Sequence, residues 1–574
     1  MMPTRPAVLS AELHAAIIRW KSQDPDPRTR DQLDRLTETA ETGDEASALE
    51  LTEAFAGPLT FGTAGLRGKI GPGPGRMNRV VVAQAAAGLA GYLVDQGEHG
   101  SKVVIGYDAR HYSDVFAHDT AEILAGAGFS PQLLPQSLPT PVLAFAIRQL
   151  GCSAGVMVTA SHNPRQDNGY KVYLGDGVQI VPPADAGVAA KITEVAAGSV
   201  MDLSRSDAIT VVGPELLEAY LDRAVATVAD ATLDSRVELV YTPLHGVGGK
   251  VVPELLERAG FGRPLVATTQ AEPDPDFPTA AFPNPEEQGA LEPAYAFADE
   301  HKIALVIAND PDADRCAVAV KRVDAAPGEP ARRTTARASA GWQRLTGDQL
   351  GALLGDDALR RGVSGTYAAS IVSSSLLSTM AAAHRQPFAA TLTGFKWIAR
   401  VPGLVYGYEE ALGYCCDPAA VTDKDGMTAL LRVVAIITAL SADGRTLDDR
   451  LDEIDRTYGL HATNQFAVRV SNLSVISDAM ARLRSQPPAA LAGEPVRVVD
   501  LADGTDGLPP TDGVLLTGNS VRVVARPSGT EPKLKCYLEV RLSPPDSQDL
   551  TTARARAADT LVRLQAEMAT ALGV

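Results

Sequence analysis

The turn at 159–164, Thr-Ala-Ser-His-Asn-Pro, places the hydroxyl of Ser161 beside an imidazole, between two strand-like segments. A hydroxyl in this setting can carry a phosphoryl group, but serine is a poor nucleophile at neutral pH and needs a metal ion or a base. Serine, asparagine and proline are also ordinary turn formers, and a serine in such a turn often bonds only the backbone. The hexapeptide therefore indicates phosphoryl chemistry only together with other motifs.

Three aspartates, Asp310, Asp312 and Asp314, crowd the turn between the strand-like runs 304–308 and 316–320. Carboxylates this close repel one another unless a cation neutralises them. Oxygen ligands at this density suit Mg²⁺, with a phosphate oxygen and water filling the remaining octahedral positions. The alternative is an aspartate-rich solvated turn. We expect a magnesium site here.

The segment 526–532, Arg-Pro-Ser-Gly-Thr-Glu-Pro, lies between two strand-like runs. It gathers a guanidinium, two hydroxyls and the backbone N–H groups around Gly529, a combination that suits a phosphate group. An ordinary turn is the alternative interpretation.

A fourth motif, Gly-Thr-Ala-Gly-Leu-Arg-Gly, occupies residues 62–68. In this order and spacing, the motifs at 62–68, 159–164, 309–315 and 526–532 resemble those of the α-D-phosphohexomutase family, from about Phe61 to Tyr537. The resemblance implies an α/β protein with three related mixed-sheet domains and a smaller C-terminal α+β domain around one central cleft. The loop Tyr-Glu-Glu-Ala at 408–411 is similar to the branch that contains phosphopentomutases and bacterial phosphoglucomutases.

The resemblance also assigns roles to individual residues. The implied catalytic residues are Ser161 as a phosphoserine, His162, Lys171 and Arg67; the metal ligands are Ser161, Asp310, Asp312 and Asp314; the substrate contacts are Arg315, Thr393, Glu409, Lys424, Arg526, Ser528, Gly529 and Thr530. His162 and Lys171 would transfer protons, and Arg67 would offset the charge of the phosphoserine. The segment 526–530 would hold the non-reacting phosphate. Many family members have a serine two residues after the sugar-binding glutamate, where this chain has Ala411.

From this set we expect a Mg²⁺-dependent mutase that interconverts hexose 1-phosphate and hexose 6-phosphate, of glucose, mannose or both, through a hexose 1,6-bisphosphate. A phosphopentomutase is the closest alternative. A metal-dependent sugar phosphatase is disfavoured by the second phosphate site at 526–530. A binding protein on a degenerate scaffold is disfavoured because Ser161 and the three aspartates are intact.

The chain has 574 residues, a formal net charge of −18 and a pI near 5.0. Nucleic acids and acidic membranes bind basic surfaces, so we expect neither as a partner, but a small phosphosugar instead. The first residues contain no apolar signal region, which predicts a cytoplasmic protein, as a monomer or homodimer. Five scattered cysteines predict reduced core thiols rather than disulfides.

Apolar runs alternate with helical patterns in three successive blocks, which predicts α/β domains. We expect domains at 1–204, 205–325, 326–457 and 458–574, a helical layer from about Ser10 to Ala56, and a final helix from about Thr551 to Leu572. The stretch 324–340 lacks periodicity and predicts a loop. His245 follows a strand, and we expect it to be structural.

Overall fold

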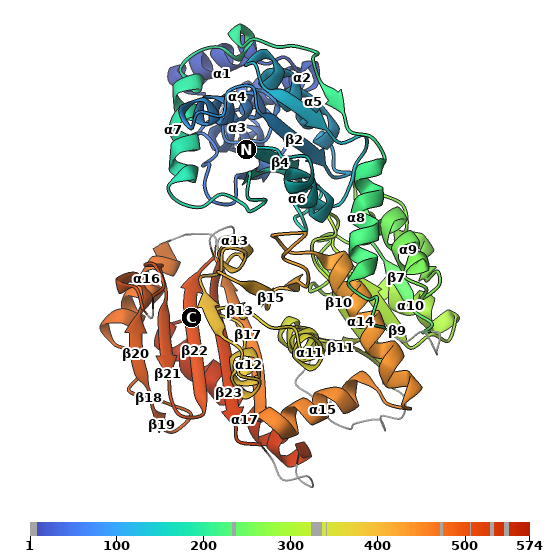
Figure 1. Ribbon diagram of the computed structural model, residues 1–574. Coiled ribbons are helices and arrows are strands. Elements are labelled where there is room, and N and C mark those ends of the chain that lie inside the picture. Colours follow the sequence, from blue (N-terminus) through green and yellow to red (C-terminus); the bar gives the residue numbers. More distant parts are fainter. Residues whose placement is uncertain are drawn as a thin grey trace.

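The computed structural model describes residues 9–231, 237–322, 341–470, 474–505, 507–528, 533–544 and 550–574, and the backbone of 336–339. Four larger sheets follow one another along the chain. Each sheet with its helices is called the first, second, third or fourth domain. In Figure 1 the first domain lies at the top, the second at the right, the third in the centre and the fourth at the lower left.

Three helices precede the first sheet, as the sequence predicts: α1 (Ala11–Gln23), α2 (Pro27–Glu41) and α3 (Glu45–Ala54). Each begins with a side chain that accepts a hydrogen bond from a backbone N–H of the first turn, supplied by Ser10, Asp26 and Asp44 respectively. Trp20 and Leu33 pack into the core of the first domain. The helical layer therefore covers that domain.

The first sheet has the order β1-β5-β4-β2-β3-β6. Its elements are β1 (Leu66–Lys69), α4 (Arg79–Asp95), β2 (Lys102–Tyr107), α5 (Ser113–Gly126), β3 (Ser130–Leu133), α6 (Thr140–Gln149), β4 (Ala154–Val158), β5 (Asp167–Leu174), α7 (Ala184–Ala196), the 3₁₀ turn Val200–Asp202 and β6 (Thr210–Val211). Successive residues of β2 face opposite sides: Val103 and Ile105 join the core under α4 and α5, whereas Val104 joins the core that includes α6.

The second sheet has the order β11-β12-β10-β9-β7-β8. Its elements are α8 (Glu215–Ala226), β7 (Val240–Thr242), α9 (Gly248–Arg258), β8 (Leu265–Val266), the 3₁₀ turn Thr268–Gln270, α10 (Glu292–Glu300), β9 (Leu305–Ala308), β10 (Ala317–Lys321), β11 (Ala336–Ser339) and β12 (Trp342–Arg344). The expected loop at 324–340 is thus wrong at 336–339, where β11 pairs with β12. Residues 324–335 and 340 of that stretch lie outside the described residues.

The third sheet has the order β14-β13-β15-β16. Its elements are α11 (Gly347–Arg360), β13 (Thr366–Ser370), α12 (Leu376–Ala383), β14 (Phe388–Thr391), α13 (Phe395–Ile398), β15 (Leu404–Glu409), β16 (Gly413–Cys415), α14 (Gly426–Ala442) and α15 (Leu447–Tyr458). One hydrophobic core extends through the second and third domains to α6 of the first. These three domains therefore share buried surface.

The fourth sheet is antiparallel, with the order β17-β23-β22-β21-β20. Its domain contains β17 (Leu460–Arg469), α16 (Ser474–Ser485), the small pair β18 (Ala490–Leu491) and β19 (Glu494–Pro495), β20 (Arg497–Asp500), the 3₁₀ turn Leu501–Asp503, β21 (Val514–Thr517), β22 (Val521–Pro527), β23 (Lys533–Leu542) and α17 (Leu550–Leu572). It has its own core. The predicted three α/β domains and α+β domain are confirmed.

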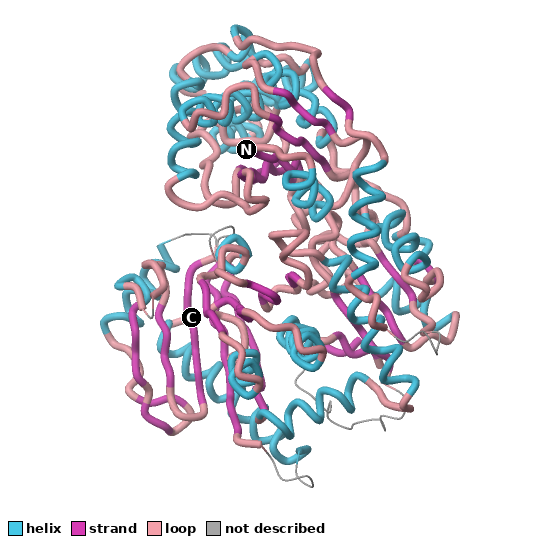
Figure 2. Tube along the Cα trace, in the orientation of Figure 1, coloured by secondary structure: helices cyan, strands magenta, loops and turns pink. Residues whose placement is uncertain are grey.

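The expected domain limits stay predictions; strand pairing places β6 with the first sheet, and β11 and β12 with the second. All five cysteines are free thiols and four are buried, as predicted. Among the described helices, none alone has the length and apolar composition to cross a membrane, and α14 with α15 meets that criterion only as a pair bent by 93°. Figure 2 shows loops gathered at the centre of the molecule, below the first domain.

The fourth domain is attached to the third through the carboxylate of Glu539 on β23. It accepts hydrogen bonds from the Ser374 hydroxyl at 2.8 Å and the Ser375 N–H at 2.7 Å, at the start of α12. His461 Nδ1 lies 3.2 Å away, and the Arg522 guanidinium donates to backbone carbonyls of the same third-domain loop. Burial raises the pKa of Glu539, but the hydrogen bond and charge of His461 outweigh it and hold the pKa at about 2.

We predict that Glu539→Ala weakens the contact between the third and fourth domains, because the buried donors of the 371–376 loop lose their acceptor. The expected loss of stability is about 2–4 kcal/mol. Hydrogen exchange at pH 7 should increase in 371–376. The stabilisation by Glu539 is present above its ordinary pKa of 4.5 and is lost as the pH falls toward 2. Glu494→Ala is the control, since Glu494 accepts from Ser520 and Val521 inside the fourth domain. Equal exchange of 371–376 in both variants would contradict the prediction.

Candidate active site

The three aspartates predicted to bind metal lie together in the turn after β9. Asp310, Asp312 and Asp314 are fully buried, and one carboxylate oxygen of each lies within 4.8 Å of the others. Ala313 between them has a φ of 56°, a left-handed conformation that is costly for a residue with a β-carbon. The backbone of this turn therefore has to be held by its surroundings.

Each of the three domains around the turn supplies such a contact. The Thr140 N–H at the start of α6 donates to the Asp312 carbonyl at 3.0 Å, and the Val247 N–H donates to the Pro311 carbonyl at 2.9 Å. From the third domain, Gly426 lies so close that a β-carbon there would be 2.3 Å from the Arg315 carbonyl oxygen. Glycine is needed at 426 for this approach.

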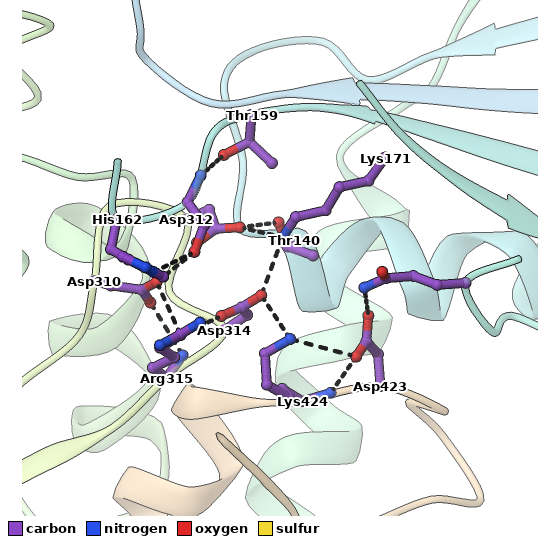
Figure 3. Close-up of polar contacts among 12 residues, drawn as sticks. Thr140, Thr159, His162, Lys171, Asp310, Asp312, Asp314, Arg315, Asp423 and Lys424 are labelled. Carbon is purple, nitrogen blue, oxygen red and sulfur yellow. Dashed lines mark hydrogen bonds and ion pairs between the residues drawn. The ribbon is translucent and has the colours of Figure 1, made fainter. Parts of the chain in front are cut away.

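Two lysines from different domains neutralise the carboxylates (Figure 3). Lys171 of β5 donates to Asp312 at 2.8 Å and to Asp314 at 3.1 Å, and Lys424, in the loop before α14, lies 3.2 Å from Asp314. Burial lowers the pKa of Lys171, but the carboxylates of Asp312 and Asp314 outweigh it and raise the pKa. Burial likewise opposes the ionisation of Asp314, yet the nearby cations hold its pKa far below the ordinary value. The turn is thus strongly polar and closed to solvent.

The residues present fit a divalent cation. Asp312 Oδ1 and Asp314 Oδ1 are buried and have no hydrogen-bond partner among the described residues. Each of these two carboxylates therefore has one oxygen that could coordinate a cation. Burial, reinforced by the charges of Asp312 and Asp314, raises the pKa of Asp310 well above its ordinary value. A bound cation would relieve that repulsion. Oxygen-only ligands of this kind suit Mg²⁺.

Ser161 lies against this turn. Its hydroxyl donates to Asp310 Oδ2 at 2.9 Å and lies 3.3 Å from His162 Nδ1. The side chain is buried, and the residue has a φ of 53°. Ser161 follows β4 of the first sheet and the aspartate turn follows β9 of the second, so the two loops meet between the two domains. The structure therefore brings the serine and the carboxylates together.

His162 and Arg67 lie beside the serine. Burial, together with the positive charges of Arg315 and Arg67, lowers the pKa of His162 well below its ordinary value. Arg67 of β1 donates to Asn163 Oδ1 at 3.0 Å, and burial lowers its pKa as well. The imidazole is therefore uncharged at neutral pH, and negative charge placed beside it would favour its taking up a proton.

The residues expected to contact the sugar and its second phosphate come from the third and fourth domains, with Arg315 from the second. Glu409 at the end of β15 is buried and accepts from the Gly394 N–H at 2.6 Å, next to Thr393. Arg315 donates to the Ala411 carbonyl at 3.1 Å. The other expected contacts are at and after the end of β22: Arg526 is its second-last residue, and the Ser528 N–H donates to the Lys533 carbonyl at 2.8 Å. Gly529 and Thr530 lie outside the described residues.

The sequence did not single out Thr140 or Lys396, which also reach this region. The Thr140 hydroxyl donates to Asp312 Oδ2 at 2.7 Å, although its Thr-Pro sequence reads only as a helix start. Lys396 Nζ donates to the Thr63 hydroxyl at 2.6 Å and so connects the third domain to the loop before Arg67. Both contacts join segments distant in sequence, which no local pattern reveals. His245, expected to be structural, lies 2.8 Å from the Thr279 hydroxyl.

Four domain models of the phosphoglucomutase/phosphomannomutase family match successive parts of the chain. They are alpha/beta/alpha domain I at 58–198, domain II at 218–324, domain III at 346–458 and the C-terminal domain at 490–557.

Relatives match over most of their length. A Haemophilus influenzae protein named "Probable phosphomannomutase" is 46% identical, over 83% of this chain and 96% of the relative. A Staphylococcus aureus phosphoglucomutase is 32% identical, over 88% and 94%. The Homo sapiens phosphopentomutase is 33% identical, over 94% and 93%.

Among solved structures, the open form of the Paramecium phosphoglucomutase pp63/parafusin matches with a TM-score of 0.67, over 91% of this chain and 97% of that one. At 17% identity this likeness shows the shared fold. The four successive domain matches and the relatives above 30% identity show that the chain belongs to the phosphoglucomutase/phosphomannomutase family and is a phosphohexomutase, an intramolecular phosphotransferase of the isomerase class.

Proposed function

We propose that the enzyme interconverts the 1-phosphate and 6-phosphate of glucose, and of mannose less efficiently, with Ser161 as the phosphoryl carrier. The observation that carries the proposal is the hydrogen bond from the Ser161 hydroxyl to Asp310, inside a triad of carboxylates with free buried oxygens. A phosphoryl group on this hydroxyl would lie between the cation ligands and the side chains of His162 and Arg67.

Asp310, Asp312 and Asp314, with an oxygen on Ser161, are the residues that would hold Mg²⁺. When bound, Mg²⁺ supplies positive charge that neutralises a phosphoryl group during transfer. Thr140 and Lys171 both donate to Asp312 Oδ2. They therefore orient this carboxylate so that Oδ1 has no hydrogen-bond partner among the described residues.

The reaction proceeds in two transfers. Phospho-Ser161 gives its phosphoryl group to the free hydroxyl of the hexose phosphate; the O–P bond to serine breaks, and a hexose 1,6-bisphosphate forms. The hydroxyl proton leaves to a nearby base, for which His162 is the candidate, and Lys171, which Asp312 and Asp314 hold protonated, is the candidate to give a proton to the Ser161 oxygen that leaves. The bisphosphate then turns end over end, and its other phosphoryl group returns to Ser161. Arg67 offsets the negative charge beside the serine.

The proposed substrate contacts come from the second, third and fourth domains. Glu409 would bind ring hydroxyls, assisted by Arg315, Thr393 and Lys424. The segment 526–530, with Arg526, Ser528, Gly529 and Thr530, would hold the phosphate that does not react. A mutase needs this second phosphate site in both orientations of the bisphosphate, whereas a phosphatase does not.

A phosphopentomutase is the second candidate. It is favoured by the likeness to the human phosphopentomutase and by Ala411, which lacks the hydroxyl that many family members have there. The test is phosphorus NMR of the purified enzyme with glucose, mannose or ribose 1-phosphate, Mg²⁺ and a trace of the matching bisphosphate. Conversion of glucose 1-phosphate to the 6-phosphate supports the proposal, and release of free phosphate would instead indicate a phosphatase.

The carrier role of Ser161 predicts one phosphoryl group on the protein after treatment with glucose 1,6-bisphosphate, and none on Ser161→Ala. Intact-mass analysis measures both. Ser153→Ala is the control, because that serine is partly exposed and its hydroxyl donates to Glu98. Equal phosphate incorporation in the wild type and Ser161→Ala would show that another residue is the carrier.

The metal role predicts that Asp312→Ala binds Mg²⁺ at least about tenfold more weakly and turns over more slowly. Calorimetric titration with Mg²⁺ measures the affinity. The apo protein should stay folded, since removing one carboxylate also relieves repulsion. Asp356→Ala is the control, because Asp356 is a buried aspartate of α11 whose partner is Arg450 of α15. Unchanged Mg²⁺ affinity and full activity of Asp312→Ala at low Mg²⁺ would exclude this site.

Specificity should depend on position 411. A hydrogen-bonding group discriminates between hydroxyl configurations more strongly than an apolar group does. We therefore expect Ala411→Ser to change the ratio of kcat/KM for glucose 1-phosphate and mannose 1-phosphate by more than about threefold, with less than about 0.5 kcal/mol change in stability. A wild type that uses ribose 1-phosphate and ignores both hexoses would overturn the hexose preference and leave the mutase chemistry standing.

A further inference from the structure

Arg110, in the connection between β2 and α5, holds the serine loop from behind. Its guanidinium is fully buried and donates to two carbonyls from Nη2, Ser161 at 2.5 Å and Asn163 at 2.7 Å. Nη1 donates to the carbonyls of Pro164 at 3.0 Å and Asp167 at 3.2 Å. One side chain therefore contacts four carbonyls of a seven-residue loop, an arrangement that only the planar fork of arginine can make.

The same arginine is fixed by Asp108, and Asp108 reaches the serine from its other side. The Asp108 carboxylate lies 3.2 Å from Arg110 Nε and accepts from the Thr159 hydroxyl at 2.6 Å. The Thr159 oxygen in turn accepts from the Ser161 N–H at 2.8 Å. Both backbone polar groups of Ser161 are thus held by one connected network.

This network accounts for the backbone conformation of the serine. Ser161 has a φ of 53°, a left-handed conformation that is strained for a residue with a β-carbon and persists only where the surroundings enforce it. The peptide bond is planar and trans, so directing the Ser161 carbonyl toward Arg110 directs the His162 N–H the opposite way. The Ser161 side chain meanwhile reaches Asp310.

Solvent and competing groups are kept from the guanidinium. Phe277 of the second domain covers it, with the guanidinium carbon 4.9 Å from the ring centroid. Burial lowers the pKa of Arg110, and the charge of Asp108 opposes that effect. The hydrogen bonds of the Arg110 guanidinium go to backbone carbonyls and not to the side chains that would hold the cation. Its role therefore differs from those of Arg67 and Lys171.

We propose that Arg110 is a positioning residue for phosphoryl transfer: through the carbonyls of the 161–167 loop it fixes the direction of the Ser161 side chain. The inference rests on the proposed carrier role of Ser161. A displacement of the reacting atoms by about 1 Å costs on the order of 100-fold in rate, whereas sugar binding by the third and fourth domains is unaffected.

The experiment uses the full-length enzyme with Mg²⁺ and glucose 1-phosphate. Arg110→Lys keeps the charge and loses the fork, and we expect kcat to fall about 100-fold with KM within about twofold of the wild type. The phosphorus NMR resonance of phospho-Ser161 should shift. Arg79→Lys is the matched control, since Arg79 forms a bidentate ion pair with buried Asp119 in the same domain. Its kcat and resonance should stay unchanged.

A second pair of variants tests the inference even if Arg110→Lys does not fold. Thr159→Val removes the acceptor for the Ser161 N–H and should lower kcat with the same unchanged KM, and Thr159→Ser, which keeps the hydroxyl, should restore it. The inference is overturned if Thr159→Val, or a folded Arg110→Lys, retains wild-type kcat and resonance, or if Arg79→Lys shows the same loss. A wild-type resonance that survives in Ser161→Ala would overturn the carrier role itself, and the two failures are thus distinguishable.

Discussion

Repulsion among three buried carboxylates is the constraint on which this molecule depends. Asp310, Asp312 and Asp314 occupy one turn without solvent, and such charges are stable only with compensating cations. Lys171 arrives from the first domain, Arg315 from the turn itself and Lys424 from the third domain. The electrostatics of one turn therefore require three domains to pack in a fixed arrangement.

The fold meets this requirement by directing strand ends toward one place. The loops after β4 and β9 carry Ser161 and the three aspartates, and Glu409 is the last residue of β15. Left-handed backbone at Ser161, Ala313 and Leu412 marks the same three loops. Strain of this kind is retained where surrounding contacts enforce it, and functional loops commonly have it. The core shared by the first three domains supplies rigid strands beneath.

The sequence predicted the four-domain architecture and the convergence of Ser161 with the aspartate turn, because these residues sit in short motifs next to strong apolar runs. It missed Arg110, Thr140 and Lys396, whose contacts join segments far apart in the chain. It also treated 336–339 as loop, since β11 has no apolar alternation and pairs only at the sheet edge. Individual site roles stay predictions, as do the domain limits.

The division of the cations between domains has a consequence for synthesis of the protein. The ribosome completes the aspartate turn well before it reaches Lys424, and domains tend to fold in the order in which they emerge. A nascent second domain then carries three carboxylates that lack one of their compensating charges. The charge balance of the finished turn is consequently a property of the whole chain, and an isolated second domain would carry more uncompensated negative charge in this turn than the complete protein does.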